Sequence, residues 1–164
     1  MNPLYQFDQA GFSYGPSKVL AGVSMEMPAG CLVALTGPNG AGKSTLLGIM
    51  AGLRHPYQGS CRFKGREVRA WKRAAFARSV SFVPQSLRLE FPFTAEQVVY
   101  MGRTPYAGGL FESPDDIDAA RKAMELTDVT AFAHRDFRSL SGGERQRVVL
   151  ASALAQQPEV LLLD

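Results

Sequence analysis

The stretch Gly37-Pro38-Asn39-Gly40-Ala41-Gly42-Lys43-Ser44-Thr45 decides the fold of this chain. It fits the pattern G-x-x-x-x-G-K-[ST], in which glycines let the backbone turn tightly so that successive N–H groups point at one anion. Lys43 adds a positive charge for the outer phosphates, and the Ser44 hydroxyl is a ligand for Mg²⁺. The stretch therefore predicts a site for a nucleoside triphosphate. The residues expected to contact the nucleotide here are Gly37, Asn39, Gly40, Ala41, Gly42, Lys43, Ser44 and Thr45.

The flanks of this loop support the prediction. Residues 31–36 (CLVALT) form an apolar run typical of a buried strand, and residues 43–51 are typical of a helix that ends before Gly52 and Pro56. The helix then begins at the phosphates, where its unpaired N–H groups and positive dipole end favour negative charge. A glycine-rich turn without a ligand is the alternative, but chance would rarely bring strand, loop and helix together in this order.

A second motif, Leu140-Ser141-Gly142-Gly143-Glu144, opens a helical run that continues to Ala155. Ser141 followed three residues later by Glu144 is a capping box, so the motif could be no more than a well-capped helix. The two glycines argue against this, because glycine destabilises a helix interior by about 1 kcal/mol per residue. Their advantage would be close approach of backbone N–H groups to a negative ligand.

The phosphate loop and this second motif together resemble the ATP-binding-cassette family, whose signature sequence is LSGGQ. The chain has LSGGE, so Glu144 departs from the family pattern. The resemblance implies ATP and Mg²⁺ as cofactors and a head-to-tail dimer with a second nucleotide-binding subunit. In such a dimer, Ser141, Gly142, Gly143 and Glu144 of one subunit face the ATP held by the phosphate loop of the other.

Three more residues match the family. Gln85 follows the apolar run 80–83, as the Q-loop glutamine does, although a glutamine after a strand is more often a solvated loop residue. Tyr14 resembles the aromatic residue that stacks on adenine; the alternative is a strand side chain buried by period-two alternation. Asp164 ends the apolar run 160–163, the Walker B pattern, and would hold Mg²⁺ through water. The resemblance thus implies Lys43, Gln85 and Asp164 as catalytic residues and Ser44, Gln85 and Asp164 as the metal site.

The chain stops at Asp164. In the family the next residue is a glutamate that polarises the attacking water, and a histidine near the γ-phosphate follows later. His55 and His134 both precede the Walker B run and are expected at the surface instead. We therefore expect a partial nucleotide-binding domain that does not by itself turn over ATP.

Composition is that of a globular protein, with 46% hydrophobic and 20% charged residues. No apolar run approaches the roughly 18 residues of a membrane span, and the start lacks the features of a secretory signal. Cys31 and Cys61 both fall in expected strands and are predicted to be reduced, buried thiols. These features favour a cytoplasmic protein, and the resemblance places it on the inner face of the cell membrane through permease subunits.

Basic residues gather between residues 62 and 78, here named the basic stretch. Its members are Arg62, Lys64, Arg66, Arg69, Lys72, Arg73 and Arg78. Such a stretch can mark nucleic acid or an anionic membrane. A solvated face is the favoured interpretation, because no ladder of aromatic residues accompanies the charges.

The predicted fold is α/β: a P-loop core with a mainly parallel sheet, N-terminal antiparallel strands and a helical insertion that bears the signature. The expected division is 1–85 for the ATP-binding core with its β subdomain, 86–139 for the helical subdomain, and 140–164 for the signature helix and Walker B strand. The elements expected along the chain are strands within 4–36 with a turn at Gly15-Pro16, short antiparallel strands in 59–68, a helix in 70–78, a strand at 80–83, and helices capped by Thr94 and Ser113.

The resemblance implies an ATP-binding subunit of a transporter that couples ATP hydrolysis to transport. Residues 93–106 look like those of importers of iron–siderophore, haem or cobalamin. We expect residues 86–106 to contact the membrane-spanning permease, with a substrate-binding protein as an indirect partner. The alternative is a soluble cassette protein that acts on nucleic acid or the ribosome. It is disfavoured because the chain has neither a C-x-x-C pair nor room for a long coiled coil, so no nucleic-acid partner is expected.

Overall fold

The computed structural model describes residues 3–87, 89–106 and 113–164. The chain divides into two compact units, Met1–Lys72 together with Asp164, and Arg73–Leu163. We call these the N-terminal unit and the C-terminal unit. The predicted boundaries at 85/86 and 139/140 differ from this contact-based division and stay predictions; Arg88 and residues 107–112 of the predicted insertion lie outside the described residues.

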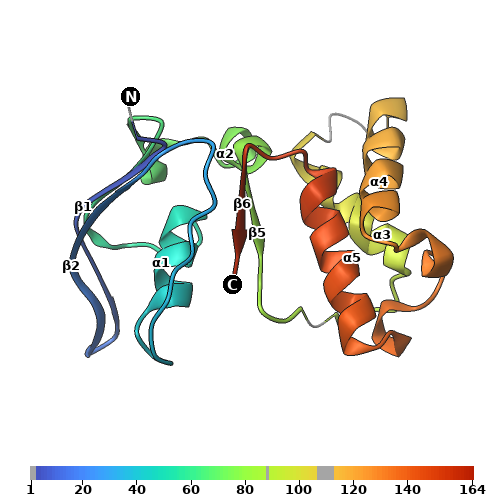
Figure 1. Ribbon diagram of the computed structural model, residues 1–164, viewed down its shortest axis with the longest axis horizontal. Coiled ribbons are helices and arrows are strands. Elements are labelled where there is room, and N and C mark those ends of the chain that lie inside the picture. The colour runs from blue at the N-terminus through green and yellow to red at the C-terminus, as the bar shows by residue number, and fades with distance from the viewer. Residues whose placement is uncertain (1–2, 88, 107–112) are drawn as a thin grey trace. The chain divides into compact units, whose positions relative to one another are not determined.

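The N-terminal unit is built on an antiparallel sheet (Figure 1). Its strands are β1 (Tyr5–Tyr14), β2 (Ser17–Met27), β3 (Gln58–Phe63) and β4 (Arg66–Glu67), in the order β2-β1-β3-β4. Alternation sets the buried face: Tyr5 and Phe7 are buried, whereas Asp8 is exposed. The hairpin turns at Gly15, whose φ of 56° suits glycine. These antiparallel strands and the turn were predicted, and both are confirmed.

Helix α1 (Lys43–Met50) packs on this sheet through Leu46, Ile49 and Met50, all buried. The Tyr5 hydroxyl donates to the Met50 carbonyl oxygen at 2.9 Å and ties the sheet to the last turn of the helix. The helix is capped by Ala51 and followed by Gly52, with φ of 70°. The helix predicted at the phosphate loop is therefore present, and it ends where glycine allows the chain to reverse.

The strand predicted at residues 31–36 is absent, and this prediction was wrong. The segment has no regular structure, and Leu32 is 98% exposed. An apolar run becomes a buried parallel strand only when neighbours on both edges complete its hydrogen bonds. No ladder in the described part of the chain includes this segment. The prediction for the two thiols was half wrong for the same reason, because Cys61 in β3 is buried but Cys31 is exposed.

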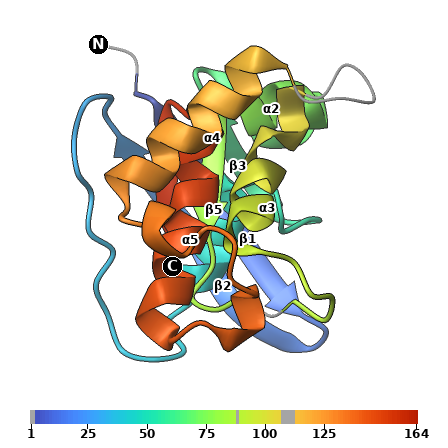
Figure 2. The same cartoon turned by 90° about the vertical axis from the view of Figure 1, so that its right-hand side faces the viewer.

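The C-terminal unit combines a short parallel sheet (Figure 1) with three main helices (Figure 2). Helix α2 (Arg73–Ser79) leads directly into β5 (Val80–Val83), which pairs in parallel with β6 (Val160–Leu163). The predicted parallel pairing is confirmed for these two strands, the one parallel ladder among the described residues. The larger sheet is antiparallel, so the parallel part is smaller than predicted.

Helices α3 (Ala95–Tyr100), α4 (Pro114–Leu126) and α5 (Gly142–Ala155) form the core of this unit. Helix α5 packs against both α3 and α4 through small side chains such as Ala151 and Ala155, which are fully buried. Gly102, in the 3₁₀ segment η2 (Met101–Tyr106), approaches α5 so closely that any side chain there would collide with the Ser152 carbonyl oxygen. Small residues on both sides thus let α5 lie close to its neighbours.

The three predicted N-caps are confirmed. Thr94, Ser113 and Ser141 each accept a hydrogen bond from the backbone N–H three residues on, and each forms a reciprocal capping box.

Among the described helices, none is long and apolar enough to cross a membrane.

Candidate functional site

The phosphate loop adopts the backbone geometry that its glycines permit. Gly40 and Gly42 have φ of 82° and 89°, in the region that only glycine adopts without strain. At Gly42 space is a second constraint, because a Cβ would come within 2.7 Å of the Leu20 side chain. The Ala41 N–H donates to the Pro38 carbonyl oxygen at 3.2 Å and closes the turn. Gly42 then caps α1 directly.

Lys43 folds back over this loop. Its Nζ donates to the carbonyl oxygens of Gly37 and Pro38, both at 2.8 Å. The ammonium group is therefore held by the carbonyl oxygens of the loop that leads into α1. This is the region where a helix N-terminus and backbone N–H groups favour an anion.

Ser44 and Asp164 meet although they are 120 residues apart in sequence. The Ser44 hydroxyl donates to Oδ1 of Asp164 at 2.6 Å. Both groups are exposed oxygen donors, and Mg²⁺ prefers one or two such ligands with phosphates and water completing its shell. The donor set therefore fits the predicted ion. The next residue, Thr45, is buried under the loop.

Tyr14 lies at the end of β1 and is 47% exposed, so the alternative of a buried strand side chain is wrong. Its ring contacts Phe12 edge-on, with centroids 4.9 Å apart, and the Arg54 guanidinium lies 5.9 Å from its centroid. Nearly half of the residue is therefore accessible to solvent. Contact with adenine stays a prediction.

The signature motif begins α5. Ser141 Oγ accepts from the Glu144 N–H at 3.3 Å, and a Glu144 carboxylate oxygen accepts from the Ser141 N–H at 2.7 Å. A Cβ placed on Gly142 or Gly143 would meet nothing within 4 Å. Internal packing therefore does not require glycine at these positions. What the glycines provide is open backbone at the first turn of the helix, which suits an incoming ligand.

The hydrogen bonds from Ser141, first its backbone N–H and then its side chain, hold the pKa of Glu144 below its usual range, and Arg135 adds to the effect. The fifth position of the motif therefore carries a full negative charge at neutral pH. A glutamine there would carry none.

Gln85 follows β5 and lines a pocket of about 260 Å³ in the C-terminal unit. The other walls come from its neighbours in 84–87, from Phe137 and from the first turns of α5 at Gly142, Arg145, Gln146 and Val149. The Q-loop candidate and the signature helix thus line one pocket of the same unit. The prediction that Gln85 shares a metal ion with Ser44 and Asp164 stays a prediction.

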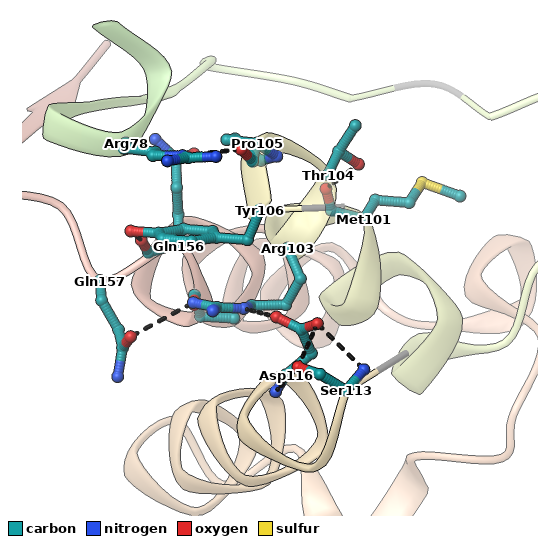
Figure 3. Close-up of polar contacts among 11 residues, drawn as sticks. Arg78, Met101, Arg103, Thr104, Pro105, Tyr106, Ser113, Asp116, Gln156 and Gln157 are labelled. Atoms are coloured by element: carbon teal, nitrogen blue, oxygen red, sulfur yellow. Dashed lines mark hydrogen bonds and ion pairs between the residues drawn. The ribbon is translucent and has the colours of Figure 1, made fainter. Parts of the chain in front are cut away.

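Arg103, within the predicted permease-facing segment, was given no individual role from the sequence, yet it makes several polar contacts (Figure 3). It is 7% exposed, and its Nε lies 2.7 Å from Oδ1 of Asp116 at the start of α4. Its Nη1 donates to the Ala155 carbonyl oxygen at 2.8 Å, at the C-terminal end of α5. Tyr106 lies 3.9 Å from the guanidinium, measured to the ring centroid. A buried arginine between two helix ends leaves no periodic signal in the sequence.

Tyr106 extends the same network (Figure 3). Its hydroxyl donates to the Gln156 carbonyl oxygen at 3.0 Å, and the Arg78 guanidinium lies 5.2 Å from its ring centroid. Arg78 Nε in turn donates to the Pro105 carbonyl oxygen at 2.9 Å. The segment η2 is thereby fixed to α2 and to the end of α5.

The apolar side chains of residues 86–106 divide into two groups. Phe93 and Tyr100 pack against the helical core, whereas Phe91 and Met101 are 68% and 40% exposed. Part of the set therefore packs internally, and part faces solvent. The seven basic residues of the basic stretch are all exposed, which fits both a solvated face and a binding surface, so the solvated face stays a prediction.

Comparison with known proteins gives the family. Residues 20–164 match the family model described as ABC transporter. The chain is 49% identical over 150 residues to the hemin import ATP-binding protein HmuV of Streptomyces coelicolor, covering 92% of this chain and 53% of that protein. It is 48% identical over 148 residues to the cobalamin import ATP-binding protein BtuD of Halobacterium salinarum, covering 90% and 37%.

Among solved structures, one described as an inward-facing conformation of a metal-chelate type ABC transporter matches with a TM-score of 0.81 and 30% identity. The match covers 100% of this chain and 60% of that one. The chain spans about half the length of the curated relative from Streptomyces coelicolor that it matches. With a family model matching residues 20–164, a glycine-rich loop that begins α1 and a capped signature helix, the chain belongs to the ABC transporter family of ATP-binding proteins.

Proposed function

We propose that the protein is the ATP-binding subunit of an ABC importer and couples ATP binding and hydrolysis to uptake of an iron chelate, haem or cobalamin. The carrying observation is the Ser44–Asp164 pair at the start of α1, next in sequence to a lysine whose ammonium group bonds to the glycine-rich loop. The names of the two relatives, hemin import and cobalamin import, support the substrate class.

In this proposal Lys43 and the loop N–H groups bind the β- and γ-phosphates. Ser44 and Asp164 would hold Mg²⁺, Asp164 through water. Gln85 would sense the γ-phosphate through the same ion. The ion would supply neutralisation of the developing phosphate charge. Tyr14 stacks on the base. The protein's own contribution is mainly positioning, which is the larger part of catalysis in phosphoryl transfer.

The second half of each ATP site would come from another copy. Ser141, Gly142 and Gly143 present open backbone and a hydroxyl at a helix start. In a head-to-tail dimer these groups would meet the γ-phosphate of the ATP bound by the partner.

The membrane partner would be a permease that contacts residues 86–106, where Phe91 and Met101 are exposed. The subunit would then lie on the cytoplasmic side as a peripheral component. A substrate-binding protein would act on the permease and not on this subunit.

The test uses the complete subunit and compares Lys43→Ala with Ser141→Ala. Lys43→Ala is expected to weaken ATP binding to the monomer, because it removes the charge over the loop. Ser141→Ala is expected to spare monomer binding and to reduce ATP-driven dimerisation. Ser139→Ala is the matched control, since the Ser139 hydroxyl donates to the Asp136 carbonyl oxygen outside the signature motif. Equal loss of monomer affinity in Ser141→Ala and Lys43→Ala would contradict the composite site.

A further inference from the structure

The start of α5 carries a charge that its proposed ligand would oppose. Glu144 stands where the family signature has glutamine, and its carboxylate lies at the N-terminus of the helix, 2.7 Å from the Ser141 N–H. The ligand proposed for this helix start is a triphosphate, which is also negative. Like charges at one site repel, so a carboxylate here needs compensation.

Arg135 is the group placed to provide it. Its Nη1 lies 2.9 Å from Oε1 of Glu144. The other carboxylate oxygen, Oε2, accepts the hydrogen bond from the Ser141 N–H. The Glu144 side chain is 21% exposed and the Arg135 side chain 50% exposed, so the pair lies at the rim of the helix start.

The backbone of Arg135 is fixed on both sides. Its N–H donates to the Phe132 carbonyl oxygen, and its own carbonyl oxygen accepts from the Ala95 N–H at the start of α3, both at 3.0 Å. The neighbouring residue Asp136 forms a β-bridge with Thr94. The guanidinium therefore extends from an ordered anchor toward Glu144.

We propose that Arg135 is a positioning residue of the composite ATP site, which neutralises Glu144 so that the signature helix accepts the triphosphate bound by the partner subunit. The inference rests on the proposed function. The proposal concerns the charge of Glu144: a carboxylate is tolerated at the fifth signature position because Arg135 pairs with it. The lowered pKa of Glu144 keeps that carboxylate ionised, so the need for Arg135 persists at neutral pH.

The experiment is a double-mutant cycle in the complete subunit, with nucleotide-driven dimerisation measured by sedimentation in Mg²⁺ and an ATP analogue that is not hydrolysed. Arg135→Gln is expected to weaken each ATP site by about twofold to fivefold, the range of an exposed ion pair. Because the symmetric dimer contains two such sites, the dimerisation constant should fall by about fourfold to 25-fold.

Glu144→Gln added to Arg135→Gln should restore dimerisation to within about twofold of the unmodified protein. Glutamine accepts the same capping hydrogen bond as glutamate, so the helix start is kept while the charge is removed. The matched control is Arg138→Gln, because Arg138 has the same 50% side-chain exposure but pairs with Asp136. Added salt should reduce the Arg135→Gln effect.

The outcomes separate the two proposals. If the unmodified subunit does not dimerise with nucleotide, the proposed function fails. If it does dimerise, the inference is overturned when Arg135→Gln matches the unmodified protein, when Arg138→Gln weakens dimerisation equally, or when Glu144→Gln does not restore the double variant.

Discussion

Arg103→Met should destabilise the C-terminal unit by about 3 kcal/mol, since breaking a buried ion pair from one side costs about 3–5 kcal/mol. The substitution keeps most of the aliphatic volume but removes the guanidinium from a site that is 7% exposed. Oδ1 of Asp116 and the Ala155 carbonyl oxygen would lose their partner at 2.7 and 2.8 Å, and Tyr106 would lose its stacked cation.

The lower end of that range is expected because Asp116 keeps other partners. Its second oxygen, Oδ2, accepts from the Ser113 hydroxyl at 2.7 Å and from the Ser113 N–H at 3.1 Å. The remaining carboxylate is therefore not left wholly unsolvated. A loss of about 3 kcal/mol is still a large share of the roughly 5–15 kcal/mol that stabilises a typical domain.

Urea unfolding followed by far-ultraviolet circular dichroism measures this change, because α4 and α5 are the longest of the described helices. Arg121→Met is the matched control: Arg121 pairs with Asp118 on the same α4, but both side chains are about 60% exposed, at 61% and 58%. That control should change stability by less than about 0.5 kcal/mol. Arg103→Met/Asp116→Ala should cost less than the sum of the two single changes, since no orphaned charge remains.

The same residues predict an acid dependence. Hydrogen bonding from Ser113 first, and then from Arg103, lowers the pKa of Asp116 in the folded state. A carboxyl with a lowered folded pKa contributes stability above its ordinary pKa of about 3.9, and this contribution is lost as the pH falls through the lower folded value. Arg103→Met should reduce the acid-induced loss, and Ser113→Ala should reduce it as well. The reasoning would be refuted if Arg103→Met changed the free energy of unfolding by less than about 0.5 kcal/mol, the limit expected for the control Arg121→Met.

Two further results are expected. Maleimide should label Cys31 quickly and Cys61 slowly in the folded protein, because Cys61 is buried and burial raises its pKa to about 12; equal rates would contradict the structure. Cysteines placed at Phe91 and Met101 should crosslink to cytoplasmic loops of the permease in the assembled transporter, whereas crosslinks from the basic stretch alone would favour a charged docking surface.

Local signals predicted most of the elements. The three capping boxes at Thr94, Ser113 and Ser141 were readable because each is complete within four residues of sequence. The hairpin turn at Gly15 and the glycine positions of the phosphate loop were readable for a similar reason, since the conformation they require belongs to the residue itself.

What could not be predicted depends on partners that the fold, and not a local sequence pattern, brings together. Residues 31–36 carry the composition of a buried strand, but strand formation is decided by the ladder on either side and not by the segment. Arg103 and Arg135 look like ordinary surface arginines in the sequence. Their roles arise because Asp116 and Glu144 lie at helix starts that the fold brings beside them.

Arg103 and Arg135 make the same kind of contact at the starts of two different helices. In each case the N3 carboxylate of a capping box binds the N-cap backbone N–H with one oxygen and an arginine with the other. At α4 the pair is buried, with side chains 8% and 11% exposed, so its role is to fix η2 and α5 in place. At α5 the pair is partly exposed, so the ion pair adds little to stability. Its effect is instead on the charge that a ligand meets when it approaches the open backbone of Gly142 and Gly143. The difference in burial therefore predicts different effects of the two substitutions. Arg103→Met should lower the free energy of unfolding, whereas Arg135→Gln should leave it nearly unchanged. Nucleotide-driven dimerisation should be weakened by Arg135→Gln and nearly unchanged by Arg103→Met.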